Sequence, residues 1–261
     1  AQVLRMCNSE ELQGTRIRMM PDMHAAEGCT VGTSMTVGER VNPAFVGSDI
    51  GCGMQVFRLD ASSVDYAKLD ETIRACIPSG AAIFPSANSA VRAIDLEALS
   101  CYDSISHETV TRSFGTLGGG NHFIELAQGL EGGLFLIIHS GSRNLGTQVA
   151  EYYQQIAVDL NVGKEEYFRQ RDEIITTYKE QGRRAEIQAT LKALEKEFKA
   201  KNPTLPRDLC YLYGSFMDDY LHDVDICQKF AERNRERMAE IILDKCGWTA
   251  VETFQTIHNY I

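Results

Sequence analysis

The chain has 261 residues and a mass of 29.1 kDa, a length that suits one large domain or two small ones. Hydrophobic residues make up 44% and charged residues 24%, proportions that exclude a disordered or fibrous protein. The formal net charge of -10 argues against a generally basic nucleic-acid coat, but it allows a local basic site or one built on metal ions.

The sequence contains no sign of a membrane segment. No window approaches 18 consecutive apolar residues, and the opening residues lack a basic stretch followed by an apolar one. We therefore expect no membrane partner, no signal peptide and a cytoplasmic location. The eight cysteines are scattered without a CxxC pair, which favours small buried residues over a disulfide framework.

Glycine-rich and helical sequences alternate along the chain. The first 60 residues and residues 113–146 carry short apolar runs, such as 134–138, that are typical of buried strands joined by turns. From Leu145 to about Lys201, and from Leu209 to Asp244, charged and apolar residues interleave at helical spacing, with breaks expected at 161–163 and 181–182. The sequence therefore predicts an α+β fold, with a glycine-rich sheet core and a mainly helical arm over residues 145–245. A Rossmann arrangement is disfavoured because its glycine-rich phosphate fingerprint is missing.

Residues that can bind metals lie beside glycines in loops and at strand ends. Asp49 and Cys52 are three residues apart in VGSDIGCGM, so that a carboxylate and a thiolate can turn toward one point. His122 follows three glycines, His139 ends an apolar run, and His258 lies in TIHNYI. Each alone is more often structural, but together they favour a metal site. Sulfur and nitrogen ligands suit zinc, whereas oxygen ligands used with phosphates suit manganese, so the ligand types leave the metal open.

The segment HSGSRNLG predicts an anion site at the start of a helix. Ser140, Gly141 and Ser142 are small and would leave backbone amides exposed, and Arg143 adds a bidentate donor. An ordinary strand-to-helix turn with a surface arginine is an equal alternative.

These motifs resemble those of the RtcB family of RNA-splicing ligases. MPDMHAAEGCTVG (20–32), VGSDIGCGM (46–54), GTLGGGNHFIE (115–125), HSGSRNLG (139–146) and IHN (257–259) occur in the family's order. With the helical sequence YLHDVDICQKFAERNR, the resemblance runs from about residue 16 to the last residue. It implies a single RtcB-like catalytic domain over residues 1–261, with glycine-rich loops around a metal site.

The family joins RNA ending in a 3′-phosphate or 2′,3′-cyclic phosphate to RNA with a 5′-hydroxyl, using GTP and manganese. The resemblance implies that Cys52 bridges two Mn²⁺ ions, with Asp49 and His122 completing one site and His139 and His258 the other. The partners implied are these RNA ends and GTP, with an activating protein as an optional addition. Both tRNA splicing and RNA repair are consistent with this chemistry.

The resemblance also assigns residues to the nucleotide and to catalysis. Arg143 is expected near the RNA termini, and Asp22 is assigned to catalysis with it, although fixing a loop is an equal alternative for Asp22 and His24. Glu27 stands where many relatives have a basic or neutral residue, and its role stays open. The residues implied to hold the guanylate are Asn121, His122, Phe123, Ile124, Glu125 and Asn259.

One departure from the family affects the expected activity. The family's guanylylated histidine lies well beyond the IHN motif, whereas this sequence stops at Ile261. We therefore expect a C-terminally incomplete ligase domain without that histidine. The alternatives are a catalytically inactive, metal-containing module that binds RNA ends, and a metal-dependent phosphoesterase with a water nucleophile.

Overall fold

The computed structural model describes residues 2–9, 12–25, 30–162, 165–197 and 205–259, without the side chains of residues 22, 165, 196 and 197. Its helices and strands, in chain order, mix α and β structure throughout, as the sequence predicts. The helices are α1 (Gln2–Cys7), α2 (Pro43–Val46), α3 (Tyr66–Cys76), α4 (His107–Ser113), α5 (Arg143–Asn161), α6 (Glu165–Glu180), α7 (Ile187–Glu197) and α8 (Ser215–Cys246). The strands are β1 (Ile17–Ala25), β2 (Thr30–Met35), β3 (Arg40–Val41), β4 (Gly53–Leu59), β5 (Phe123–Gln128), β6 (Leu134–Ser140), β7 (Leu212–Tyr213) and β8 (Ala250–Ile257).

The main sheet has four antiparallel strands in the order β5-β6-β4-β8. Gly53 at the start of β4 lies opposite Ser140 on one side and Ile257 on the other, and Phe123 at the start of β5 lies opposite His139. The starts of β4 and β5 therefore share one end of the sheet with the ends of β6 and β8. The pairs β1–β2 and β3–β7 form two smaller antiparallel sheets.

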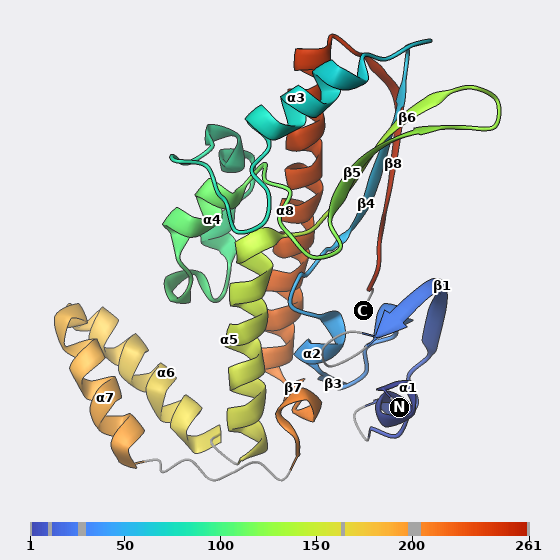
Figure 1. Ribbon diagram of the computed structural model, residues 1–261. Helices are drawn as coiled ribbons and strands as arrows, with labels where there is room; N and C mark the ends of the chain where they lie inside the picture. The colour runs from blue at the N-terminus through green and yellow to red at the C-terminus, as the bar shows by residue number, and fades with distance from the viewer. Residues whose placement is uncertain (1, 10–11, 26–29, 163–164, 198–204, 260–261) are drawn as a thin grey trace.

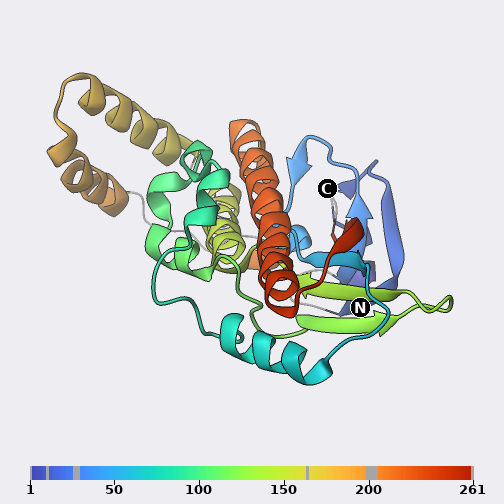
Figure 2. The same ribbon diagram turned by 90° about the horizontal axis from the view of Figure 1, so that it is seen from above.

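Helix α8 lies along the middle of the molecule, with the sheet on one side and α4 and α5 on the other (Figures 1 and 2). It ends at Cys246 and is followed by Gly247, whose left-handed φ of 72° is typical of a helix C-terminus. Helix α8 therefore contributes side chains to the core on both of its sides.

Two apolar clusters fill the spaces on either side of α8. One contains Leu145 and Tyr153 from α5 together with Phe230 from α8. The other contains Leu136 and Ile138 from β6, packed with Met238 of α8 and Leu69 of α3. Alternate residues of β6 face this second cluster, so the buried strand predicted at 134–138 is confirmed.

Most of the predicted helical sequence is helical, with its breaks near the expected places. Helix α5 ends at Asn161, and Gly182, with φ 73°, follows α6. Helices α5 and α8 belong to the core, whereas α6 and α7 form a hairpin that projects from it, with Phe168 near the start of α6 packed into the first cluster (Figure 2). Among the described residues, no helix combines the length and the apolar character that crossing a membrane requires.

Two details of the predicted elements are wrong. The helix expected from Leu209 begins at Ser215, because Leu212 and Tyr213 instead pair with β3 and Gly214 adopts a φ of 57°. The first 60 residues also contain the short helices α1 and α2, which the glycine-rich pattern does not indicate.

Candidate metal centre

One end of the four-stranded sheet collects the predicted metal ligands. Cys52 immediately precedes β4, His122 immediately precedes β5, His139 lies near the end of β6, and His258 immediately follows β8. Because neighbouring strands are antiparallel, these four positions lie at the same end of the sheet. Side chains that are distant in the sequence thereby meet in space.

Cys52, His139 and His258 form the first group of ligand atoms. The Cys52 Sγ atom lies 3.4 Å from His139 Nε2, and the Nε2 atoms of the two histidines lie 2.9 Å apart. Both histidines are buried. All three ligand atoms lie within 4.8 Å of one another, so that a single cation could contact all of them.

Asp49, Cys52 and His122 form the second group. The His122 Nε2 atom lies 2.9 Å from Asp49 Oδ2 and 3.5 Å from Cys52 Sγ. Cys52 thus belongs to both groups, and its sulfur lies between the two sets of ligand atoms.

The hydrogen bonding of His122 leaves its Nε2 atom as an acceptor. Its Nδ1 atom lies 2.9 Å from the Leu117 carbonyl oxygen, which can only accept, so Nδ1 carries the proton. In the neutral ring, Nε2 then directs a lone pair toward the Asp49 carboxylate, whose Oδ1 atom is buried without a hydrogen-bond partner. Two acceptors facing each other need a proton or a cation between them. The side chains therefore fit a divalent cation, with His122 oriented as a metal-binding histidine usually is.

The protonation of Cys52 depends strongly on whether a cation is present. Burial, and to a smaller extent the Asp49 carboxylate, raise the pKa of the Cys52 thiol to about 12, while Arg235 and Arg143 act to lower it. Without a metal the thiol therefore keeps its proton at neutral pH. Metal binding would displace that proton, because the thiolate is the form that binds a metal.

His139 is held in the neutral form that a metal requires. Burial, followed by the influence of His258 and His122, lowers the pKa of His139 to about 4. Its ring is therefore uncharged at neutral pH and can offer a lone pair without first losing a proton.

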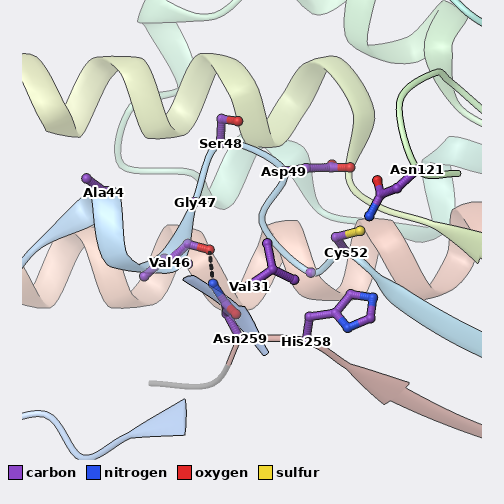
Figure 3. A pocket seen from close by; sticks show the side chains of 11 residues that line it. Val31, Ala44, Val46, Gly47, Ser48, Asp49, Cys52, Asn121, His258 and Asn259 are labelled. Atoms are coloured by element: carbon purple, nitrogen blue, oxygen red, sulfur yellow. Dashed lines mark hydrogen bonds between the residues drawn. The ribbon is translucent and has the colours of Figure 1, made fainter. Parts of the chain in front are cut away.

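A cavity of about 150 Å³ opens beside these side chains. Asp49, Cys52, Asn121 and His258 lie around it (Figure 3). This volume is below the range of about 300–1,000 Å³ usual for small-molecule pockets, so it suits a phosphate group better than a whole nucleotide. The other lining residues are Val31, Ala44, Val46, Gly47, Ser48, Gly51 and Asn259.

Two glycines allow the loops to approach closely enough to build the site. Gly51 has a φ of 77°, and a Cβ atom there would lie 2.9 Å from the Ala231 side chain on α8. At Gly141 a Cβ atom would overlap the Asp49 carboxylate. Position 51 therefore requires glycine for steric reasons, whereas a side chain at position 141 would have to displace the Asp49 carboxylate.

Arg143 lies close to the two groups of ligands. It is the only non-glycine residue with positive φ among those described, with φ 55°. Its Nε atom lies 3.4 Å from Thr116 Oγ1, and its pKa is lowered by burial, with Asp49 and Cys52 acting in the opposite direction. Residues 140–142, whose backbone amides the sequence predicts to be exposed, are buried, with Asn234 of α8 and the Asp49 side chain against Gly141.

The residues assigned to the guanylate lie around the same end of the sheet. Asn121 is exposed at the cavity, and Phe123 is 36% exposed, with its ring centroid 5.1 Å from that of His139. Glu125 is exposed on the same side of β5 as Phe123. Ile124 points the other way and packs against the core beneath the sheet, so its side chain does not face the cavity.

Asn259 lines the cavity, but its side chain is occupied by backbone hydrogen bonds. Its Oδ1 atom accepts from the amides of Gly32 and Thr33 at 3.0 and 3.2 Å. Its Nδ2 atom donates to the carbonyls of Phe45 and Val46 at 3.2 and 3.3 Å, the second of which is drawn in Figure 3. In this structure Asn259 therefore joins β2 to α2 beside the cavity.

The first motif lies on the β1–β2 pair. His24 is exposed on β1, opposite Val31 on β2. The side chain of Asp22 and all of Glu27 lie outside the described part of the chain, so the catalytic assignment of Asp22 stays a prediction.

Among the buried polar residues of helix α8, Asn234 and Arg235 contact the segments that carry the candidate ligands, and the sequence reasoning missed them. A signal was available, because residues 227, 230, 231, 234, 235 and 238 fall on one side of the helix at spacings of three and four. The other four are apolar and buried, so polar residues at 234 and 235 should also be buried.

Comparison with known proteins agrees with the motifs. The model of the family described as tRNA-splicing ligase RtcB matches residues 4–102 and 88–260. RNA-splicing ligase RtcB of Escherichia coli strain K12 is 29% identical over 279 aligned positions, which cover 94% of this chain. RNA-splicing ligase RtcB1 of E. coli strain ATCC 25922 matches with the same identity and coverage.

A more distant relative is the tRNA-splicing ligase RtcB of Aeropyrum pernix, which is 27% identical over 59% of this chain and 44% of its own length. The chain spans 59% of the length of each of the two E. coli relatives. Because the family's model matches nearly all of its residues, this chain belongs to the RtcB family.

Proposed function

We propose that the protein is a Mn²⁺- and GTP-dependent RNA ligase that joins a 3′-phosphate or 2′,3′-cyclic phosphate end to a 5′-hydroxyl end. The observation that carries the proposal is the shared sulfur of Cys52, which lies between the Asp49–His122 pair and the His139–His258 pair. Two adjacent cations recur in enzymes that act on phosphate esters, where they stabilise the attacking and leaving oxygens. Membership of the RtcB family supports the same chemistry.

Each of the two ligand groups would hold one Mn²⁺ ion. Asp49 and His122 would bind one ion, His139 and His258 the other, and Cys52 would contact both. When bound, the ions supply positive charge that neutralises phosphate oxygens during phosphoryl transfer.

The remaining residues would bind and orient the substrates. We propose that the 150 Å³ cavity takes phosphate groups, while the guanine lies outside it, along the exposed side of β5 that carries Phe123 and Glu125. Arg143 would donate to a terminal RNA phosphate, because its guanidinium provides a two-pronged donor close to the ligands. Asn121 would donate or accept a hydrogen bond at the mouth of the cavity.

In the family the guanylate is carried on a histidine that follows the IHN motif. His122, His139 and His258 would be engaged with metal and would not carry the guanylate. We propose that the guanylate acceptor is a residue outside these 261.

The experiment is to incubate the purified full-length protein with Mn²⁺, radiolabelled GTP and a pair of RNA strands with the two end types. We expect a joined RNA product and a labelled protein, and neither with Cys52→Ala. Absence of both from the parent protein, despite bound Mn²⁺ and RNA, would overturn the ligase proposal in favour of a binding module. Opening of the cyclic phosphate without GTP would indicate a phosphoesterase instead.

A further inference from the structure

Two polar residues on the buried side of α8 touch the segments that carry the metal ligands. Asn234 and Arg235 are 0% and 1% exposed. A buried guanidinium is costly for a fold unless its donors meet acceptors, and an apolar side chain at that place usually stabilises a core at least as well. Stability of the core alone is therefore a weak reason for an arginine at this position.

The guanidinium of Arg235 joins three segments of the sheet end. Its Nη1 atom donates to the carbonyl oxygens of Gly51 at 3.0 Å and Ser140 at 2.8 Å. Its Nη2 atom donates to Gln255 Oε1 at 3.0 Å. One rigid planar group thus holds the loop before β4, the end of β6 and the strand β8 at a fixed separation.

Each of these acceptors is close in sequence to a metal ligand. Gly51 directly precedes Cys52, Ser140 directly follows His139, and Gln255 is three residues before His258. Cys52, His139 and His258 are the three residues of the first ligand group. A change in the position of the guanidinium would therefore alter the distances among these three side chains.

Asn234 is hydrogen-bonded to the loop that leads to His122. Its Oδ1 atom accepts from the amide of Gly115 at 2.7 Å. Its Nδ2 atom lies 3.1 Å from the Thr116 carbonyl and 3.2 Å from Ser140 Oγ. The two neighbouring residues of α8 therefore contact all the segments that carry the histidine and cysteine ligands.

We propose that Arg235 is a positioning residue of the metal centre: it fixes the spacing of Cys52, His139 and His258 and thereby sets the affinity of the site for metal. This inference rests on the proposed function. The charge of Arg235 cannot explain such an effect, because a positive group beside a cation site opposes metal binding. The benefit has to come from geometry, which a planar fork with several fixed donors supplies and an ammonium group does not.

The test compares Arg235→Lys with Arg233→Lys in the full-length protein. Arg233 lies on the same helix but forms ion pairs only with Glu236 and Glu240 among the described contacts. Both variants exchange a guanidinium for an ammonium group and keep the charge. Each protein is titrated with Co²⁺, and the cobalt–thiolate absorption and the affinity are recorded, together with thermal unfolding of the metal-free form.

We expect Arg235→Lys to weaken Co²⁺ binding by about 10- to 100-fold, as loss of a group supporting metal ligands usually does, and to change the cobalt–thiolate spectrum. Arg233→Lys should bind like the parent. Arg235→Met, if it folds, should bind more weakly still, whereas tighter binding would show that charge outweighs geometry and would overturn the proposal. A purely structural role would lower the unfolding temperature of Arg235→Lys but leave its affinity and spectrum at parent values, which also overturns it. A parent protein that binds no Co²⁺ would instead refute the proposed metal centre, and this inference with it.

Discussion

The Nε2 atoms of His139 and His258 lie 2.9 Å apart, although His139 is on β6 and His258 directly follows β8, and these strands flank β4 on opposite sides. Such a distance places either a shared proton or a cation between the rings. The Cys52 sulfur lies 3.4 Å from one of these nitrogens and also belongs to the second ligand group. The two groups are therefore linked through a single atom.

This linkage predicts unequal effects of removing single ligands. Cys52→Ala should abolish binding of both Mn²⁺ ions, because both groups lose their common atom. His258→Ala and Asp49→Ala should each weaken one site and leave the other occupied. Elemental analysis of Mn²⁺ per chain after gel filtration measures these differences.

A second cysteine provides the matched control for Cys52. Cys227 is fully buried on α8 and lies in the apolar cluster beside α5. Cys227→Ala should lower the free energy of unfolding by removing a packed side chain but keep the parent's Mn²⁺ content. If Cys52→Ala retained the same Mn²⁺ as Cys227→Ala, the shared-ligand arrangement would be wrong.

The close approach of Gly141 to Asp49 predicts that adding a side chain at position 141 weakens metal binding. A Cβ atom there would overlap the Asp49 carboxylate, so Gly141→Ala should push Asp49 away from His122 and weaken the site that they form. Gly38→Ala is the control, because a Cβ atom at Gly38 meets nothing within 4 Å.

Calorimetric titration with Mn²⁺ compares these two glycine variants. We expect weaker binding at one of the two sites in Gly141→Ala and parent-like binding in Gly38→Ala. Identical titrations for both variants would show that the carboxylate does not take part.

The sequence allowed most of the candidate ligands to be singled out because Asp49, Cys52, His122 and His139 lie in short motifs with glycine, whereas His258 lies in TIHNYI without one. The structure brings these five side chains together, and the buried run at 134–138 indicates β6. The α+β fold class and the helical character of most of 145–245 follow from the same local patterns.

Other features depend on contacts that local patterns do not encode. Six of the eight residues of β8 are exposed, so its sequence lacks the alternation typical of a half-buried strand. Its pairing with β4 joins segments about 200 residues apart, such as Gly53 and Ile257. The burial of Arg235 is equally hard to predict, because its neighbours Arg233 and Arg237 are only half-buried and local sequence does not distinguish the three arginines.

The position of Arg143 predicts that its loss weakens RNA binding without changing metal binding. Arg143→Met removes a guanidinium close to the ligands, and hydrogen bonds to charged groups contribute about 1.5–3 kcal/mol. We expect RNA with a 3′-phosphate to bind about 10- to 100-fold more weakly, with Mn²⁺ content unchanged.

The control for this prediction is Arg74→Met on α3, where the arginine is exposed and pairs with Asp70. It removes the same charge from a surface helix. Fluorescence anisotropy with labelled RNA measures the affinity of both variants. Equal weakening in Arg143→Met and Arg74→Met would attribute the effect to net charge and contradict a specific role of Arg143.

The buried hydrogen bond between Tyr153 and Asp223 predicts a change in stability without a change at the site. The Tyr153 hydroxyl donates to Asp223 Oδ2 at 2.8 Å, and the carboxylate also accepts from the amides of Ser100 and Cys101 at 2.8 and 3.1 Å. Burial, together with the Asp223 carboxylate, raises the pKa of Tyr153, so the phenol keeps its proton and continues to donate. Tyr153→Phe leaves a buried carboxylate with one partner fewer.

We expect Tyr153→Phe to lower the free energy of unfolding by about 1–3 kcal/mol, since a buried acceptor loses a donor. Tyr66→Phe is the control, because Tyr66 is 66% exposed and its change should cost less than about 0.5 kcal/mol. Denaturant unfolding measures both values, and Mn²⁺ content should equal the parent's in each. If the two variants were equally stable, the Asp223 carboxylate would not depend on Tyr153. If Tyr153→Phe lost Mn²⁺ while still folded, the α5–α8 core would be coupled to the metal centre rather than serving only as its scaffold.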